Sequence, residues 1–130
     1  MTFLLFDLLE FTALIISIAI ESLVVSIWGI YFKLEWRLLA IVAAMSTAIT
    51  HPILWQACNH ALLTNNDIGS AIQNNYFILS LEIWVTIFEG WIYKLVMKYS
   101  WRSSLLIAGT ANLSSYLFGI FYWWAIDRRA

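Results

Sequence analysis

Four long apolar stretches, separated by short polar segments, dominate the chain. They run over residues 11–32, 38–57, 76–97 and 103–126 and contain few formal charges. A bilayer core about 30 Å thick is crossed by roughly 20 residues of α-helix. The stretches lack the polar–apolar alternation that is typical of membrane barrel strands. The pattern therefore predicts an all-α membrane protein, with four transmembrane helices in one bundle and a single transmembrane domain over residues 1–130.

The first ten residues have a different pattern. Residues 1–10 are amphipathic, with Asp7 and Glu10 three positions apart. Such a segment either lies along the membrane interface or extends the start of the first helix. It has neither a basic region nor a small-residue cleavage site, so we do not expect it to be a removable signal peptide.

Composition agrees with the membrane assignment. Hydrophobic residues make up 62% of the 130 residues and charged residues only 12%. A soluble domain carries about twice that charged fraction, and a small one cannot hide so much apolar surface. The net charge of -1 gives no basic field for nucleic acid, so the expected partner is the lipid bilayer. A single cysteine, Cys58, excludes an internal disulfide.

The basic residues indicate an orientation. The two turns over residues 33–37 and 94–102 carry five Lys or Arg, whereas the connection over residues 64–70 carries none. The positive-inside rule predicts that these turns face the cytoplasm and that both termini lie on the outer side. Arg128 and Arg129 count against this orientation. Tryptophans near the helix ends fit anchoring at headgroup level; they are Trp36, Trp55, Trp101, Trp123 and Trp124.

The two halves of the chain resemble each other weakly. Each half has, in the same order, a glutamate three positions before a valine, a glycine, a basic turn and a Trp-Arg pair. These residues are Glu21, Val24, Gly29 and Trp36-Arg37 in the first half, and Glu82, Val85, Gly90 and Trp101-Arg102 in the second. The match needs one gap of four residues, and chance could produce so few identities. A true duplication would give two parallel helical-hairpin repeats related by a pseudo-twofold axis along the membrane normal.

Polar residues inside the predicted helices fall into one layer. At about 1.5 Å per helical residue, Glu21 lies about 18 Å from Lys33, and Thr47 lies about 15 Å from the end of its turn. Helical spacing gathers these residues into stripes, which we expect to meet at the bundle centre. The candidate substrate- or ion-binding residues are Glu21, Glu82, Glu89, Thr47, Thr50, His51, Asn112 and Ser115.

The three glutamates carry the functional hypothesis. An ionised carboxylate at mid-membrane costs several kcal/mol, so it is a functional candidate by default. No Lys or Arg lies at their depth, so protonation, a bound cation or hydrogen bonds must compensate. Packing is the alternative, because Ser, Thr, Asn and protonated Glu also join membrane helices by hydrogen bonds. Pro52 adds a kink that frees the Ala48 carbonyl for a cation, a Thr hydroxyl or water.

Two functions from different classes remain open. The first is a small transporter or channel for a proton, a cation or a small polar solute, with Glu82 and Glu89 bearing charge and Glu21 as their repeat counterpart. Four short helices barely enclose a path, so this hypothesis predicts a homo-oligomer. The second is an accessory or scaffold subunit of a larger membrane complex. No catalytic or metal-binding motif occurs, so neither an enzyme nor a metal site is predicted, and no cofactor is indicated.

Overall fold

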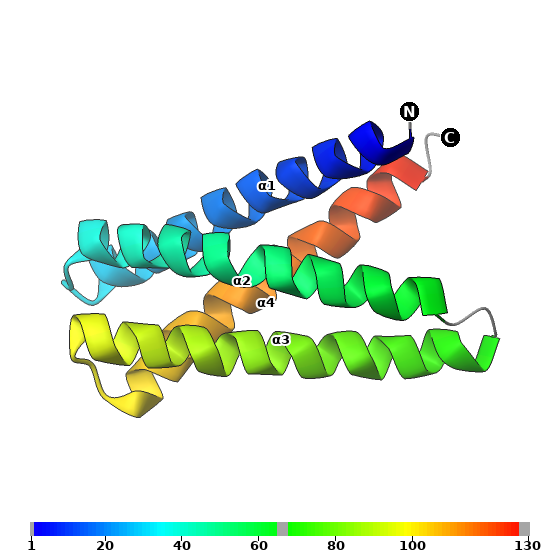
Figure 1. Ribbon diagram of the computed structural model, residues 1–130. Helices are drawn as coiled ribbons and strands as arrows, with labels where there is room; N and C mark the ends of the chain where they lie inside the picture. The colour runs from blue at the N-terminus through cyan, green and yellow to red at the C-terminus, as the bar shows by residue number, and fades with distance from the viewer. Residues whose placement is uncertain (1, 65–67, 128–130) are drawn as a thin grey trace.

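The computed structural model describes residues 2–64 and 68–127, and it forms four α-helices (Figure 1). The helices are α1 Thr2–Tyr31, α2 Trp36–Thr64, α3 Ile68–Met97 and α4 Trp101–Asp127. No strand occurs in these two ranges. Each helix contains a 22-residue segment that is long and apolar enough to cross a membrane. The prediction of an all-α chain with four such helices is therefore confirmed.

The helices extend beyond the apolar stretches that predicted them. α1 starts at Thr2, so residues 2–10 continue directly into the first helix. α2 runs through Pro52 to Thr64, and α3 already begins at Ile68. Apolar composition marks the part of a helix that fits a bilayer, whereas a helix itself continues until its backbone hydrogen bonds are interrupted. The predicted connection over residues 64–70 is correspondingly shorter, and its residues 65–67 lie outside the described residues, as do Arg128 and Arg129.

The helices pack as a four-membered ring. α1 packs against α2 and α4, and α3 packs against α4 and α2, whereas the described parts of the diagonal pairs make no contact. The two short turns lie at one end of the bundle, and the start of α1 and the end of α4 lie together at the other (Figure 1). We call these the turn end and the open end, because the helices spread apart towards the latter (Figure 1). Sequence neighbours are antiparallel, as short connections require.

The two turns share a backbone conformation. Lys33 and Lys98 both have φ of 57°, and each precedes the Trp that begins the next helix by three positions. In the first turn, the Leu34 amide donates to the Gly29 carbonyl at 2.7 Å, a contact that closes a helix C-terminus when the residue between is left-handed. A basic side chain also lies over the Trp ring in both turns, at 5.3 Å in the first and 5.5 Å in the second.

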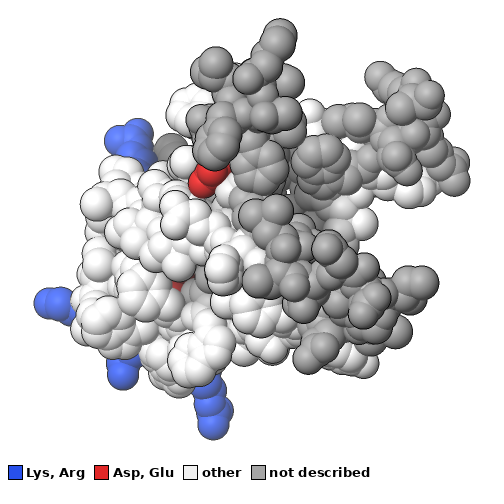
Figure 2. All heavy atoms as spheres, turned by 45° about the vertical axis from the view of Figure 1, so that its right-hand side comes forward, with Lys and Arg blue, Asp and Glu red and all other residues white. Residues whose placement is uncertain are grey.

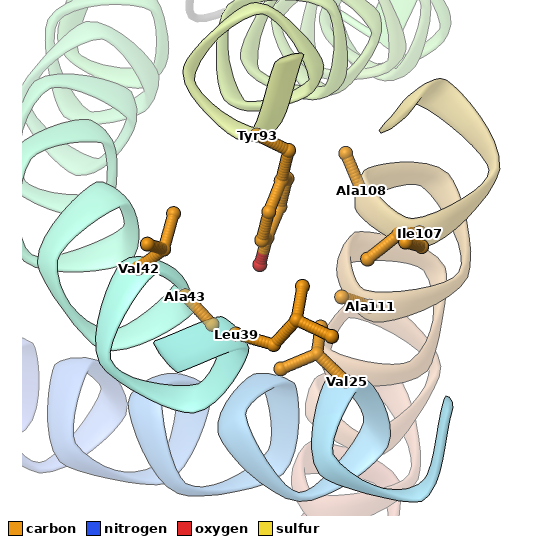
Figure 3. Packing of buried hydrophobic residues seen from close by; sticks show 8 residues of the cluster. All are labelled: Val25, Leu39, Val42, Ala43, Tyr93, Ile107, Ala108 and Ala111. Atoms are coloured by element: carbon orange, nitrogen blue, oxygen red, sulfur yellow. The ribbon is translucent and has the colours of Figure 1, made fainter. Parts of the chain in front are cut away.

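The turn end is closed by packed side chains, which we call the turn-end core. Its buried residues are Val25, Leu39, Val42, Ala43, Tyr93, Ile107, Ala108 and Ala111. Tyr93 projects from α3 into the centre of this cluster, between α2 and α4 (Figure 3). Only 1% of Tyr93 is exposed. The turn-end core therefore seals the bundle below the layer of polar residues.

Candidate functional site

Glu21 of α1 lies inside the bundle and is 3% exposed. The Thr47 hydroxyl of α2 donates to its Oε2 at 2.5 Å, and the Ser115 hydroxyl of α4 donates to its Oε1 at 2.8 Å. Each carboxylate oxygen thus has a donor from a different helix. A buried carboxyl group costs least when its oxygens are hydrogen-bonded, so α2 and α4 together make this position tolerable.

Glu89 of α3 has a matching environment and is 1% exposed. The Thr50 hydroxyl of α2 donates to its Oε1 at 2.8 Å, and the Asn112 amide of α4 donates to its Oε2 at 2.6 Å. Thr47 and Thr50 are three positions apart on α2, and so are Asn112 and Ser115 on α4. Residues three apart share one helix face, which is why one stripe on each of these helices can serve both carboxyl groups.

The hydrogen bonds relate Glu21 to Glu89. Counted from the Trp that begins α2 or α4, Thr47 and Asn112 occupy the same position, and so do Thr50 and Ser115. Exchanging these equivalents turns the two donors of Glu21 into the two donors of Glu89. The sequence pattern instead pairs Glu21 with Glu82, because aligning the valines and glycines of the two halves places these two glutamates at the same position. This alignment leaves a gap of four residues. Glu82 lies seven residues before Glu89, or about 10 Å further along α3 towards the open end.

A cavity of about 550 Å³ lies between the four helices. Every helix contributes to its wall, from Thr12 and Tyr122 near the open end to Thr47 and Asn112 deeper in the bundle. Seven of the eight candidate residues line it, and they are Glu21, Thr47, Thr50, His51, Glu82, Asn112 and Ser115. The eighth, Glu89, lies behind the wall and is hydrogen-bonded to two residues that line it. The structure therefore gathers all eight candidates in one place.

Glu82 and His51 differ from the other polar residues of the wall. Glu82 interacts electrostatically with Glu21, but it accepts no hydrogen bond within the described part of the chain. The Nε2 atom of His51 is buried and has no hydrogen-bond partner in the same part of the chain. The His51 ring stacks on Trp55, with ring centroids 6.3 Å apart. These two side chains therefore retain hydrogen-bonding capacity that protein groups do not use.

Aromatic residues of the wall were not among the predicted site residues. Trp55, expected to anchor the helix at the interface, lines the cavity, as do Tyr116, Phe118 and Tyr122. Tyr116 follows Asn112 by four positions, on the same face of α4, and this helical spacing was the available signal. Tyr93 likewise follows Glu89 by four positions, on the same face of α3. The side chain of Trp123 lies outside the described residues.

The charges are distributed unequally. Among the described residues that line the cavity, none is Lys or Arg. Figure 2 shows Lys and Arg projecting from the surface, and it shows Asp and Glu atoms over a smaller area. Three carboxyl groups thus lie in or behind the cavity wall, and no basic residue of the described part of the chain lines it.

The chemistry of this arrangement must be derived from its geometry. No protein-family model, no curated protein and no solved structure matches the chain. Within the described residues, no group of three or more His, Cys, Asp or Glu side chains is arranged to hold a metal ion. The site can accept protons on its carboxyl groups and can attract a positive charge. Its polar groups also join all four helices, so they contribute to packing as well.

Proposed function

We propose that the chain is an integral membrane protein that crosses the bilayer four times, with both turns in the cytoplasm and the open end on the outer side. The exposed surface of the four helices supports this proposal. Large apolar side chains lie outward along every helix, including Ile27, Met45, Trp84 and Leu117. In water such a surface would drive aggregation, whereas lipid is a suitable solvent for it.

We further propose that it transports a proton, a cation or a small polar solute through the cavity. The observation that carries this proposal is a cavity wall that holds carboxyl groups and, among its described residues, no Lys or Arg. Intramembrane ionisable groups that face a cavity mark ion and substrate pathways. The turn-end core closes one side, so the structure resembles one state of a carrier with outward access rather than a continuous pore.

The two hairpins, α1–α2 and α3–α4, are proposed to be repeats related by a pseudo-twofold axis. The shared turn conformation and the exchangeable donors of Glu21 and Glu89 support this relation. Each carboxyl group has one donor from its own hairpin and one from the other hairpin. The bonds that cross between hairpins are Ser115 to Glu21 and Thr50 to Glu89.

These crossing bonds provide a physical basis for a transport cycle. A proton or a bound cation on Glu21 or Glu89 competes with the hydroxyl groups that hold the hairpins together. Loss of both crossing bonds would let one hairpin rock against the other, as repeat halves do in other carriers. The site lies within one chain, so a second copy is not needed to form it. A homo-oligomer remains a prediction.

Flux measurements with glutamine variants test the proposal. The full chain is reconstituted in liposomes that contain a pH-sensitive dye. A proton gradient is imposed, and K⁺, Na⁺ or tetraphenylphosphonium is supplied outside. We expect the wild-type protein to change the internal pH in response to at least one of these conditions. Glu82→Gln and Glu89→Gln should abolish that response, because neither amide can take up and release a proton.

The matched control is Glu35→Gln, which removes a carboxyl group from the first turn, outside the cavity. It should leave the flux unchanged. Size-exclusion profiles of all variants verify that they are folded. Normal flux in both the position-82 and position-89 variants would refute the assignment. No flux by the folded wild-type protein under any condition would favour the accessory-subunit alternative.

A further inference from the structure

The size of the cavity bears on what it binds. A proton needs only a carboxyl oxygen, and a bare metal ion needs a few converging ligands. The cavity is about 550 Å³, within the range of about 300–1,000 Å³ that is usual for small-molecule sites. It is lined by residues of all four helices and reaches Glu21 in the bundle interior. Its volume therefore suits an organic molecule rather than an ion alone.

The wall of the cavity is mainly apolar and aromatic. Its lining includes both aliphatic side chains and aromatic rings, among them Ile16, Leu54, Trp55, Tyr116, Phe118 and Tyr122. Binding to such a wall is favourable in free energy because it covers apolar surface of the ligand. The faces of Trp and Tyr rings also attract cations. The wall thus favours a molecule with an apolar body and tolerates a positive charge beside it.

The ionisable groups determine the sign of the charge. Glu21 and Glu82 line the cavity, and none of its lining residues in the described part of the chain is Lys or Arg, so this part of the wall favours a cation over an anion. The oxygens of Glu21 are occupied by two hydroxyl donors, but Glu82 has no hydrogen-bond donor in the described part of the chain. A neutral ligand would leave the Glu82 carboxylate without a counter-charge. A cationic ligand would supply one.

We infer that the cavity binds a hydrophobic organic cation, an amine or quaternary onium ion whose charge pairs with Glu82 and whose body packs against Trp55 and Tyr116. This inference deepens the transport proposal and rests on it. His51 lines the same wall.

Equilibrium binding of tritiated tetraphenylphosphonium to the purified full chain in mild detergent tests the inference. We expect saturable binding that an excess of the unlabelled cation displaces. Triphenylphosphine oxide has a similar body without the charge, and tetramethylammonium has the charge without the body. Both should compete at least tenfold more weakly than tetraphenylphosphonium itself. Equal competition by the neutral compound would contradict the role of Glu82.

Two variants probe the site by independent means. Glu82→Gln removes the pairing charge, and Gly119→Leu fills open space, because a Cβ at Gly119 meets no atom within 4 Å. Each should weaken tetraphenylphosphonium binding at least tenfold, whereas Glu35→Gln should not alter it. Unsaturable binding, or unchanged affinity in both cavity variants, would overturn the inference. Glutamine-sensitive flux with a proton, Na⁺ or K⁺ would in that case still support transport, so the two proposals fail separately.

Discussion

Replacing Asn112 with leucine is expected to destabilise the bundle by about 2 kcal/mol or more, because it leaves Oε2 of the buried Glu89 without its donor. Asn112 donates to this oxygen at 2.6 Å, and both residues are almost fully buried. Leaving an oxygen of a buried carboxyl group without a hydrogen bond lowers the free energy of unfolding far more than the apolar contacts of the leucine side chain raise it. The loss is measured as a shift of the unfolding midpoint in SDS, with the protein initially in mild detergent.

The compensated variant separates packing from function. If Glu89, Asn112 and Thr50 are all replaced by apolar residues of similar size, as Glu89→Leu, Asn112→Leu and Thr50→Val, no unpaired group remains around that carboxyl position. Replacing a complete buried polar cluster in this way is often neutral or stabilising. We therefore expect the triple variant to recover most of the stability that Asn112→Leu alone loses.

The flux of the same triple variant then decides why the polar layer exists. If the polar layer serves only packing, the triple variant should regain the activity of the wild-type protein together with its stability. Under the transport proposal, the triple variant is folded and inactive, because it lacks the proton-accepting group. A folded triple variant with wild-type flux would show that Glu89 serves only to join the helices. A triple variant no more stable than Asn112→Leu would contradict the hydrogen-bond account itself.

The sequence predicted the helices better than it predicted their ends. Apolar stretches of about 20 residues are a strong signal for a membrane-spanning helix. In lipid, only a helix or a closed barrel satisfies the hydrogen bonds of its whole backbone. The ends at Thr2, Thr64 and Ile68 depend on local hydrogen bonding outside the apolar part, which hydropathy does not report.

The sequence grouped the candidate residues together, but it did not predict which of them are hydrogen-bonded to one another. Depth from the turns and helical spacing placed Glu21, Thr47 and Asn112 in one layer, and in the structure all three line one cavity. The similar hydrogen-bonding of Glu21 and Glu89 was missed, because the glycines set the alignment of the two halves. The cavity was not foreseen, since the spreading of helices at the open end depends on tertiary packing that a single helix pattern does not contain.

The glycines explain why one end of the bundle is closed and the other open. A Cβ placed on Gly29 would lie 2.5 Å from the Trp36 Cβ and 2.6 Å from the Trp36 Cα. The backbones of α1 and α2 therefore meet here at a distance that only glycine permits. At Gly90 the nearest atom is the end of the flexible Leu105 side chain, at 2.9 Å. Each hairpin thus has a close helix–helix approach near its turn, which makes the hairpin the natural rigid unit of any rocking motion.

The same substitution at two glycines should therefore have opposite outcomes. Gly29→Ala forces α1 away from the start of α2 and should cost about 3 kcal/mol or more, at the upper end of what overpacking costs. Gly119→Ala meets no atom within 4 Å and should be neutral, or stabilising by up to about 1 kcal/mol through better helix propensity. Both are measured by SDS unfolding, alongside the amount of monodisperse protein recovered. Equal stability of the two variants would mean that α1 and α2 are not in close contact at Gly29. The hairpin could then no longer be treated as one rigid unit in the proposed transport cycle.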